Sequence, residues 1–76
     1  MKQIKFDSVL IIGVGLIGSS LARAIKEYNI SKNVYGIDTN LKNLEVCREL
    51  KILNKGSDQL SDFSHQFDLI IICCPL

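Results

Sequence analysis

The chain has 76 residues, of which 47% are hydrophobic and 22% are charged, and its formal net charge is +1. A chain of this size and composition is typical of one globular domain at most. Its nine lysine and arginine residues are scattered along the sequence, which argues against nucleic acid or an anionic membrane as a partner. The uncharged run 9–22 is also shorter than the ~20 residues that a membrane-spanning helix needs.

The sequence contains three cysteines, Cys47, Cys73 and Cys74. They form neither a CxxC motif nor a Cys/His pattern with metal-ligand spacing, and two of them are adjacent in an apolar run, where a metal centre or a disulfide framework is disfavoured. We therefore expect reduced, buried thiols and no metal, as is typical of a cytoplasmic protein.

Residues 9–12 (VLII) are apolar and mostly β-branched, which predicts a central parallel strand covered on both faces. A helix is expected after the glycines that follow, because apolar residues recur there on one helical face. The residues of this face are Ile17, Leu21, Ile25 and Tyr28. Asn29, a residue type that tolerates the left-handed conformation, would end the helix.

Residues 34–38 (VYGID) predict a second strand, and Asn40 is placed to cap a second helix. The expected buried stripe of this helix is Leu41, Leu44, Cys47 and Leu50. Between 52 and 67 the pattern is weaker. It allows a very short strand within NKGSD and a helical turn or two in QLSDFSHQF, with Leu60, Phe63 and Phe67 inward. Residues 68–74 (DLIIICC) predict a third strong strand, ended by Pro75.

The alternation of strands and helices predicts an α/β fold with a parallel sheet and right-handed crossovers. In a Rossmann-type, doubly wound sheet the strand order is 3-2-1-4, with the last strand beside the first. Both helices would then lie on one face, and the outer edge of the last strand would have no partner. A sheet of fully apolar strands seldom ends in this way, so we expect the 76 residues to be an incomplete, amino-terminal piece of a longer protein.

Residues 9–24 allow two interpretations. Preceded by Lys2 and Lys5 and ending in ARA, they are similar to a secretory signal with a cleavage site. The same residues contain GVGLIG (13–18), a phosphate-binding turn between a strand and a helix. Asp7 lies inside the would-be basic region and glycines interrupt the apolar core, so the sequence favours a retained nucleotide loop.

A GxGxxG motif alone is not specific, but this one follows a predicted strand, opens a predicted helix and precedes a strand that ends in an acidic residue. Gly13 would permit the tight turn, Gly15 would let a pyrophosphate approach the backbone, and Gly18 would allow close packing of helix on strand. The N–H groups of Leu16 and Ile17 at the start of the helix would then bind the diphosphate.

The acidic residue is Asp38, twenty residues after Gly18. Its carboxylate would accept hydrogen bonds from the adenosine ribose hydroxyls and repel a 2′-phosphate, so the expected cofactor is NAD and not NADP. Cys73, Cys74 and Pro75 lie at the carboxyl end of the strand next to the glycine strand, at the edge where open α/β sheets bind ligands. We expect them to line the nicotinamide end of the cofactor.

Plainer interpretations stay open for these residues. The glycines would serve the turn alone, Asp38 would cap a helix, and residues 73–75 would merely end a strand. His65, the single histidine, lies in a polar loop without an acid or nucleophile at a recognisable spacing, so we expect it at the surface. For Ser19 and Ser20, packing at the start of the helix is favoured over a phosphate contact.

Taken together, VLIIGVGLIGSSLARAIKE, VYGIDTNLKNLEVCREL and FDLIIICCPL resemble the start of the prephenate dehydrogenase family, which includes arogenate and cyclohexadienyl dehydrogenases. The resemblance covers essentially the whole chain, and its most specific part is LIGSSLA (16–22). The chain departs from the family pattern at Cys73-Cys74, where alanine is frequent, and at Lys51, where glycine commonly closes the second helix.

The resemblance implies a cytoplasmic, homodimeric enzyme of tyrosine biosynthesis that oxidatively decarboxylates prephenate to 4-hydroxyphenylpyruvate with NAD. Residues 1–76 would be the N-terminal portion of its dinucleotide-binding domain. The rest of that domain, the helical substrate and dimerisation domain, and the family's catalytic histidine and substrate-binding arginine would lie beyond Leu76. We therefore expect no catalytic residue within the chain, and no activity from the chain alone.

Two alternatives remain open. One is another Rossmann NAD(P)-dependent reductase or dehydrogenase, of the β-hydroxyacid or imine-reducing kind. The other is a non-catalytic NAD-sensing module, such as the regulatory nucleotide domains attached to transport proteins. Sequence after the last strand would discriminate, because a histidine-bearing loop followed by a helical domain indicates the prephenate-type enzyme.

Overall fold

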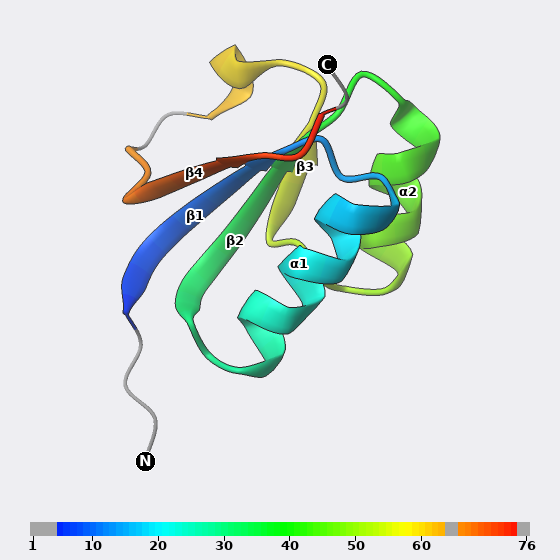
Figure 1. Ribbon diagram of the computed structural model, residues 1–76. Helices are drawn as coiled ribbons and strands as arrows, with labels where there is room; N and C mark the ends of the chain where they lie inside the picture. The colour runs from blue at the N-terminus through cyan, green and yellow to red at the C-terminus, as the bar shows by residue number, and fades with distance from the viewer. Residues whose placement is uncertain (1–4, 64–65, 75–76) are drawn as a thin grey trace.

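The computed structural model describes residues 5–63 and 66–74. Within these ranges strands and helices alternate along the chain (Figure 1). The elements are β1 (Phe6–Ile12), α1 (Leu16–Glu27), β2 (Ser31–Ile37), α2 (Leu41–Glu49), β3 (Lys55–Ser57), a 3₁₀ turn (Leu60–Asp62) and β4 (Leu69–Ile72). The strands pair in parallel in the order β3-β2-β1-β4. This confirms the predicted strand order and the Rossmann-like α/β fold, although β1 and β2 are longer than predicted and β4 is shorter.

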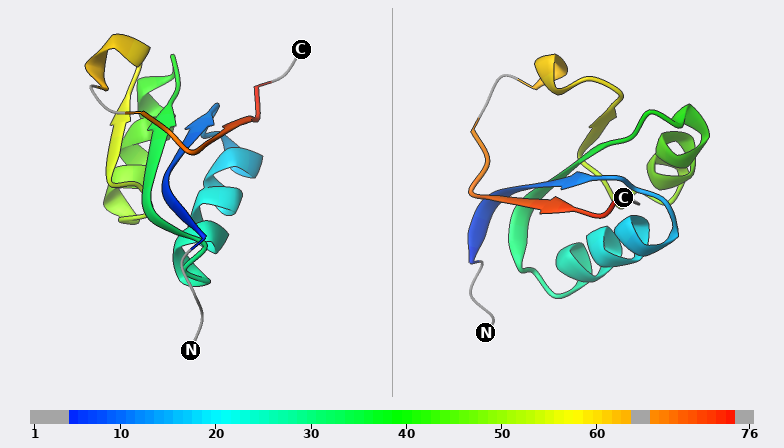
Figure 2. Two further views of the ribbon diagram at one scale, coloured as in Figure 1. Left: turned by 90° about the vertical axis from the view of Figure 1, so that its left-hand side faces the viewer. Right: turned by 45° about the horizontal axis from the view of Figure 1, so that its top comes forward.

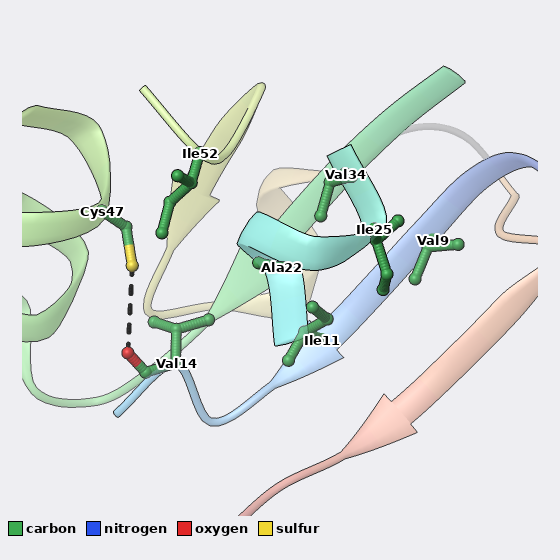
Figure 3. Close-up of a cluster of buried hydrophobic side chains, with 8 residues drawn as sticks. All are labelled: Val9, Ile11, Val14, Ala22, Ile25, Val34, Cys47 and Ile52. Atoms are coloured by element: carbon green, nitrogen blue, oxygen red, sulfur yellow. Dashed lines mark hydrogen bonds between the residues drawn. The ribbon is translucent and has the colours of Figure 1, made fainter. Parts of the chain in front are cut away.

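The main core lies between the sheet and both helices. Val9 and Ile11 point to the same face of β1, because side chains alternate along a strand, and they pack with residues of α1 and α2 (Figure 3). The cluster comprises Val9, Ile11, Val14, Ala22, Ile25, Val34, Cys47 and Ile52. Each fully buried aliphatic side chain contributes roughly 1.5–3 kcal/mol. This cluster therefore holds the helices on the sheet, both on one face as predicted.

The second face of the sheet carries a smaller aromatic cluster. Tyr35, Phe63 and Phe67 contact one another edge to face, with ring centroids 5.7–5.8 Å apart. Tyr35 pairs in register with Leu10, which is fully buried. Further along this face Ile70 and Ile72 are exposed, and among the described residues β4 pairs only with β1. Figure 2 shows β4 at one edge of the sheet.

Five residues expected in the core are exposed instead: Ile17, Tyr28, Leu41, Leu50 and Leu60. In α1 the buried residues are Gly18, Ala22 and Ile25. The helix is rotated relative to the prediction because Gly18, which has no side chain, makes the closest approach to the loop. In α2 only Cys47 is fully buried, since the helix lies over the β3 edge of the sheet and its end leucines extend beyond it.

Both helices end in the same way. Asn29 and Lys51 have positive φ angles of 54° and 58°, and the residue after each donates its N–H back into the last turn, from Ile30 to Ile25 and from Ile52 to Cys47. This is the Schellman arrangement, in which a left-handed residue follows the helix. The predicted end of the first helix at Asn29 is confirmed.

Replacing Lys51 by glycine should stabilise the chain. A non-glycine residue in the left-handed region costs about 1 kcal/mol because its Cβ crowds the following carbonyl oxygen, and Lys51 has φ of 58°. We expect Lys51→Gly to raise the free energy of unfolding in urea by about 1 kcal/mol. Lys51→Ala retains the Cβ and is the control; an equal gain in both variants would contradict this explanation.

Among the described residues no helix is long and apolar enough to cross a lipid bilayer. Within the same ranges no three His, Cys, Asp or Glu residues gather in a way that would hold a metal ion.

Candidate functional site

An open cleft of about 780 Å³ lies at the carboxyl ends of β1, β2 and β4. Eight of the nine predicted site residues line it: Gly13, Gly15, Leu16, Ile17, Gly18, Asp38, Cys73 and Cys74. The ninth, Pro75, lies outside the described residues, as does His65. The cleft is also lined by Ile12, Ile37, Thr39 and Asn43, which sequence reasoning did not assign to the site.

The GVGLIG motif (13–18) requires glycine at its first position, in the loop after β1, and at its last position, in the first turn of α1. Gly13 has φ of 94°, and a Cβ there would lie 3.0 Å from backbone atoms of Cys73 and Cys74. At Gly18 a Cβ would lie only 1.9 Å from the carbonyl oxygen of Gly13. These contacts agree with the predicted tight turn and with the predicted close packing of helix on strand.

The middle glycine, in contrast, borders open space. The nearest atom to a Cβ built on Gly15 is the amide nitrogen of Asn43, at 3.7 Å. Gly15 is also the residue that precedes α1, and as a glycine it has no side chain to cap the helix; the first turn of α1 contains no acidic residue. The first N–H groups of a helix lack partners within it and carry a partial positive charge. This end of the cleft therefore suits an anionic group.

At the start of α1 the apolar side chains are exposed, whereas the serine hydroxyls form hydrogen bonds within the helix. Leu16 is 87% and Ile17 is 75% exposed, and both line the cleft. The hydroxyls of Ser19 and Ser20 donate to the Leu16 carbonyl oxygen at 3.2 and 2.9 Å. These bonds agree with a role in the start of the helix, the interpretation that the sequence favoured.

Asp38 follows β2 directly and joins three parts of the site. Its Oδ2 accepts the backbone N–H of Val14 at 2.9 Å and the side-chain amide of Asn43 at 3.1 Å. Its Oδ1 accepts the backbone N–H of Asn40 at 2.8 Å. The carboxylate thus connects the end of β2 to the glycine loop and to the start of α2. Asp38 serves this local structure whether or not it also contacts a ligand.

The hydrogen bonds hold Asp38 in its charged form. Partial burial alone would raise the pKa of its carboxyl, but the N–H of Asn40, the amide of Asn43 and the N–H of Val14 together outweigh burial and lower that pKa below 3.8. At neutral pH the cleft therefore carries a fixed negative charge at the end of β2.

Acid should weaken the fold through Asp38. Since the pKa of this carboxyl is lower in the folded chain than in the unfolded chain, its stabilising effect is complete above the unfolded-state pKa and is lost as the pH falls through the folded-state pKa. We expect the free energy of unfolding to decline below about pH 4. The decline should be smaller in Asp38→Asn; identical pH profiles for the two chains would show that Asp38 contributes nothing.

The cysteines differ from the expectation of three buried thiols. All three are free, but only Cys47 is buried and Cys74 is exposed. The Cys73 N–H donates to the Ile12 carbonyl oxygen at 2.7 Å, so the chain after β4 stays against the loop. Residues 73 and 74 both line the cleft. Cys74 is exposed, whereas Cys73 is half-buried and packs against the core cluster.

Cys47 connects α2 to the loop from inside the core. Its thiol lies 3.9 Å from the Val14 carbonyl oxygen (Figure 3). Burial, together with the negative charge of Asp38, raises the pKa of Cys47, which keeps the thiol neutral. Val14 in the loop is therefore linked to α2 in two ways, directly by Cys47 and indirectly through Asp38, which accepts from both Val14 and Asn43.

Asn40 caps α2 as predicted, since its side chain accepts the N–H groups of Lys42 and Asn43 at 3.0 and 3.4 Å. This cap explains why Asn43, in the first helical turn, faces Asp38. The spacing Asp-x-Asn-x-x-Asn was the signal in the sequence that would have located Asn43 in the site.

These features are typical of a Rossmann-type dinucleotide-binding fold. They are a glycine loop with an open middle position, an uncapped helix start, and an acidic residue after the next strand. No protein-family model matches the chain. Two curated relatives do: a cyclohexadienyl dehydrogenase of Zymomonas mobilis, 35% identical over 93% of this chain, and a prephenate dehydrogenase of Bacillus subtilis, 32% identical over all of it.

Among solved structures, a prephenate dehydrogenase from A. aeolicus, in complex with hydroxyphenyl propionate and NAD⁺, matches with a TM-score of 0.79 and 28% identity over 93% of this chain. The chain spans only 24% and 20% of the two curated relatives and 25% of the solved chain. The resemblance to the prephenate dehydrogenase family is therefore confirmed along the chain, and it concerns the amino-terminal part of these enzymes.

Proposed function

We propose that the chain is the N-terminal, NAD-binding portion of a prephenate-type dehydrogenase. The observation that carries this proposal is the cleft in which the open position at Gly15, the start of α1 and the charged Asp38 lie together. The diphosphate would bind the N–H groups of Leu16 and Ile17. The adenosine ribose would bind Asp38, and residues 73–75 would line the nicotinamide end.

When bound, NAD⁺ supplies a hydride acceptor for oxidation of the substrate. The residues of this chain bind and orient it. The A. aeolicus structure holds NAD⁺, which supports the cofactor, and the names of the curated relatives support prephenate or a related cyclohexadienyl compound as substrate. We assign no catalytic residue to residues 1–76. We place the rest of the dinucleotide domain and a helical substrate and dimerisation domain elsewhere in the complete protein.

The proposed setting is a homodimeric enzyme of tyrosine biosynthesis in the cytoplasm, acting on a small molecule without nucleic acid or membrane partners. Three free cysteines, of which only Cys47 is fully buried, agree with a reducing compartment. The scattered positive charge offers no surface for a polyanion.

Calorimetric titration of the chain with NAD⁺ and, separately, NADP⁺ tests the proposal. We expect binding of NAD⁺ and at least tenfold weaker binding of NADP⁺, because Asp38 faces the position of the 2′-phosphate. Equal affinity for both cofactors would refute the role of Asp38. No heat with either cofactor, from a sample shown to be folded by circular dichroism, would refute the proposed function.

A further inference from the structure

Asn43 lies outside the glycine motif and is not the acidic residue that follows β2, so no sequence motif gives it a role. It is half-buried in the first turn of α2, and its side chain lines the cleft between Asp38 and Gly15. Its amide nitrogen donates to Asp38 Oδ2 at 3.1 Å. The same nitrogen lies 3.7 Å from the position of a Cβ on Gly15. One amide therefore lies beside both the ribose-binding carboxylate and the proposed path of the pyrophosphate.

The two carboxylate oxygens of Asp38 accept different numbers of hydrogen bonds. A carboxylate offers about four acceptor positions, two on each oxygen. Within residues 5–63 and 66–74, Oδ2 accepts two protein donors, from Val14 and Asn43, whereas Oδ1 accepts one, from Asn40. With its two donors Oδ2 is directed into the protein, so Oδ1 keeps an acceptor position for a ribose hydroxyl. Without Asn43, one of the three bonds that orient the carboxylate is lost.

We propose that Asn43 is a positioning residue that sets the preference of the cleft for a nucleotide with a free ribose 2′-hydroxyl, by holding Asp38 in the orientation that accepts this hydroxyl. This inference rests on the proposed function. It adds that selectivity comes from the pair Asp38–Asn43 and not from the carboxylate alone. NADP⁺ has no free 2′-hydroxyl, so it cannot make this hydrogen bond and gains less than NAD⁺ from the orientation that Asn43 sets.

The test compares Asn43→Leu with the unaltered chain. Leucine has a similar size and a better helix propensity, so α2 should persist. We expect NAD⁺ to bind about tenfold more weakly, because a hydrogen bond to a charged group is lost from the site. NADP⁺ affinity should change little, so the ratio of the two dissociation constants should fall about tenfold. General damage to the fold would weaken the binding of both cofactors to the same extent and leave the ratio of the dissociation constants unchanged.

Asn33→Leu is the matched control. Asn33 is also half-buried, and its side-chain amide donates one bond to the Asp7 carbonyl oxygen at the opposite end of β2. This variant should keep the cofactor ratio. The pKa of Asp38, followed by NMR without cofactor, should rise in Asn43→Leu only.

An unchanged ratio in Asn43→Leu, in a chain that binds NAD⁺, would overturn the inference and leave the proposed function standing. If the unaltered chain binds NAD⁺ but the pKa of Asp38 is the same in Asn43→Leu as in the unaltered chain, the inference would also be overturned. Absence of NAD⁺ binding by the unaltered chain would instead overturn the proposed function, and the inference with it.

Discussion

Gly18→Ala should unfold the chain or come close to it. The added methyl group would lie 1.9 Å from the Gly13 carbonyl oxygen and 2.9 Å from the Gly13 carbonyl carbon. Both are backbone atoms of the tight turn, so neither can rotate away, and α1 would have to move off the sheet with Ala22 and Ile25. Overpacking usually costs 1–3 kcal/mol, and a clash with backbone exceeds that range, so we expect a loss of about 3 kcal/mol or more. A chain of this length has little stability to lose.

Gly15→Ala is the matched control for this prediction. It adds the same methyl group three residues earlier in the same loop, where the nearest atom is 3.7 Å away. We expect urea denaturation, followed by circular dichroism, to show a loss below about 1 kcal/mol. The methyl group should nevertheless weaken NAD⁺ binding about tenfold by occupying the approach to the backbone. Equal stability of the two alanine variants would contradict the packing described for Gly18.

Asp38→Ser should remove the discrimination between NAD⁺ and NADP⁺. The substitution removes a charged acceptor for the ribose hydroxyls, which typically weakens binding by about 1.5–3 kcal/mol, or roughly 10- to 150-fold. It also removes the negative charge that repels a 2′-phosphate. The affinity for NAD⁺ should therefore fall while that for NADP⁺ rises, as measured by calorimetric titration.

Asp38→Ser also loses the partner of Val14, Asn40 and Asn43, so its stability should fall and binding must be measured on folded protein. Asp7→Ser makes the same change of charge at the opposite end of β1. It should leave the ratio of the two affinities unchanged. If Asp38→Ser lowered both affinities equally, Asp38 would have a structural role only.

The order of elements was readable from the sequence because β4 and the second half of β1 are continuous apolar runs and because specific residues mark the breaks. Asn29 and Asn40 were correctly predicted as a helix end and a helix cap. Gly13 and Gly18 were predictable because each meets a separate steric condition. Local chemistry of this kind does not depend on distant parts of the chain.

What the sequence could not show depends on how elements pack. The apolar spacing placed Ile17 in the core, but contact between Gly18 and Gly13 rotates α1 so that Ile17 faces the cleft. Leu41 and Leu50 fit a buried stripe, yet α2 lies at the edge of the sheet and leaves them exposed. Asn43 was missed because its role depends on a contact with Asp38 across two elements.

The most direct measurement is an NMR titration of the chain with NAD⁺, in which the backbone amide signals are followed residue by residue. We expect the largest shifts at 13–18, Asp38 and Asn43, around the cleft at the carboxyl ends of the strands. A second cavity, of about 470 Å³, lies between α2 and β3 and is lined by Leu44, Arg48 and Gly56, among others. Shifts concentrated there, or no shifts in folded protein, would contradict the assignment of the glycine loop as the cofactor site.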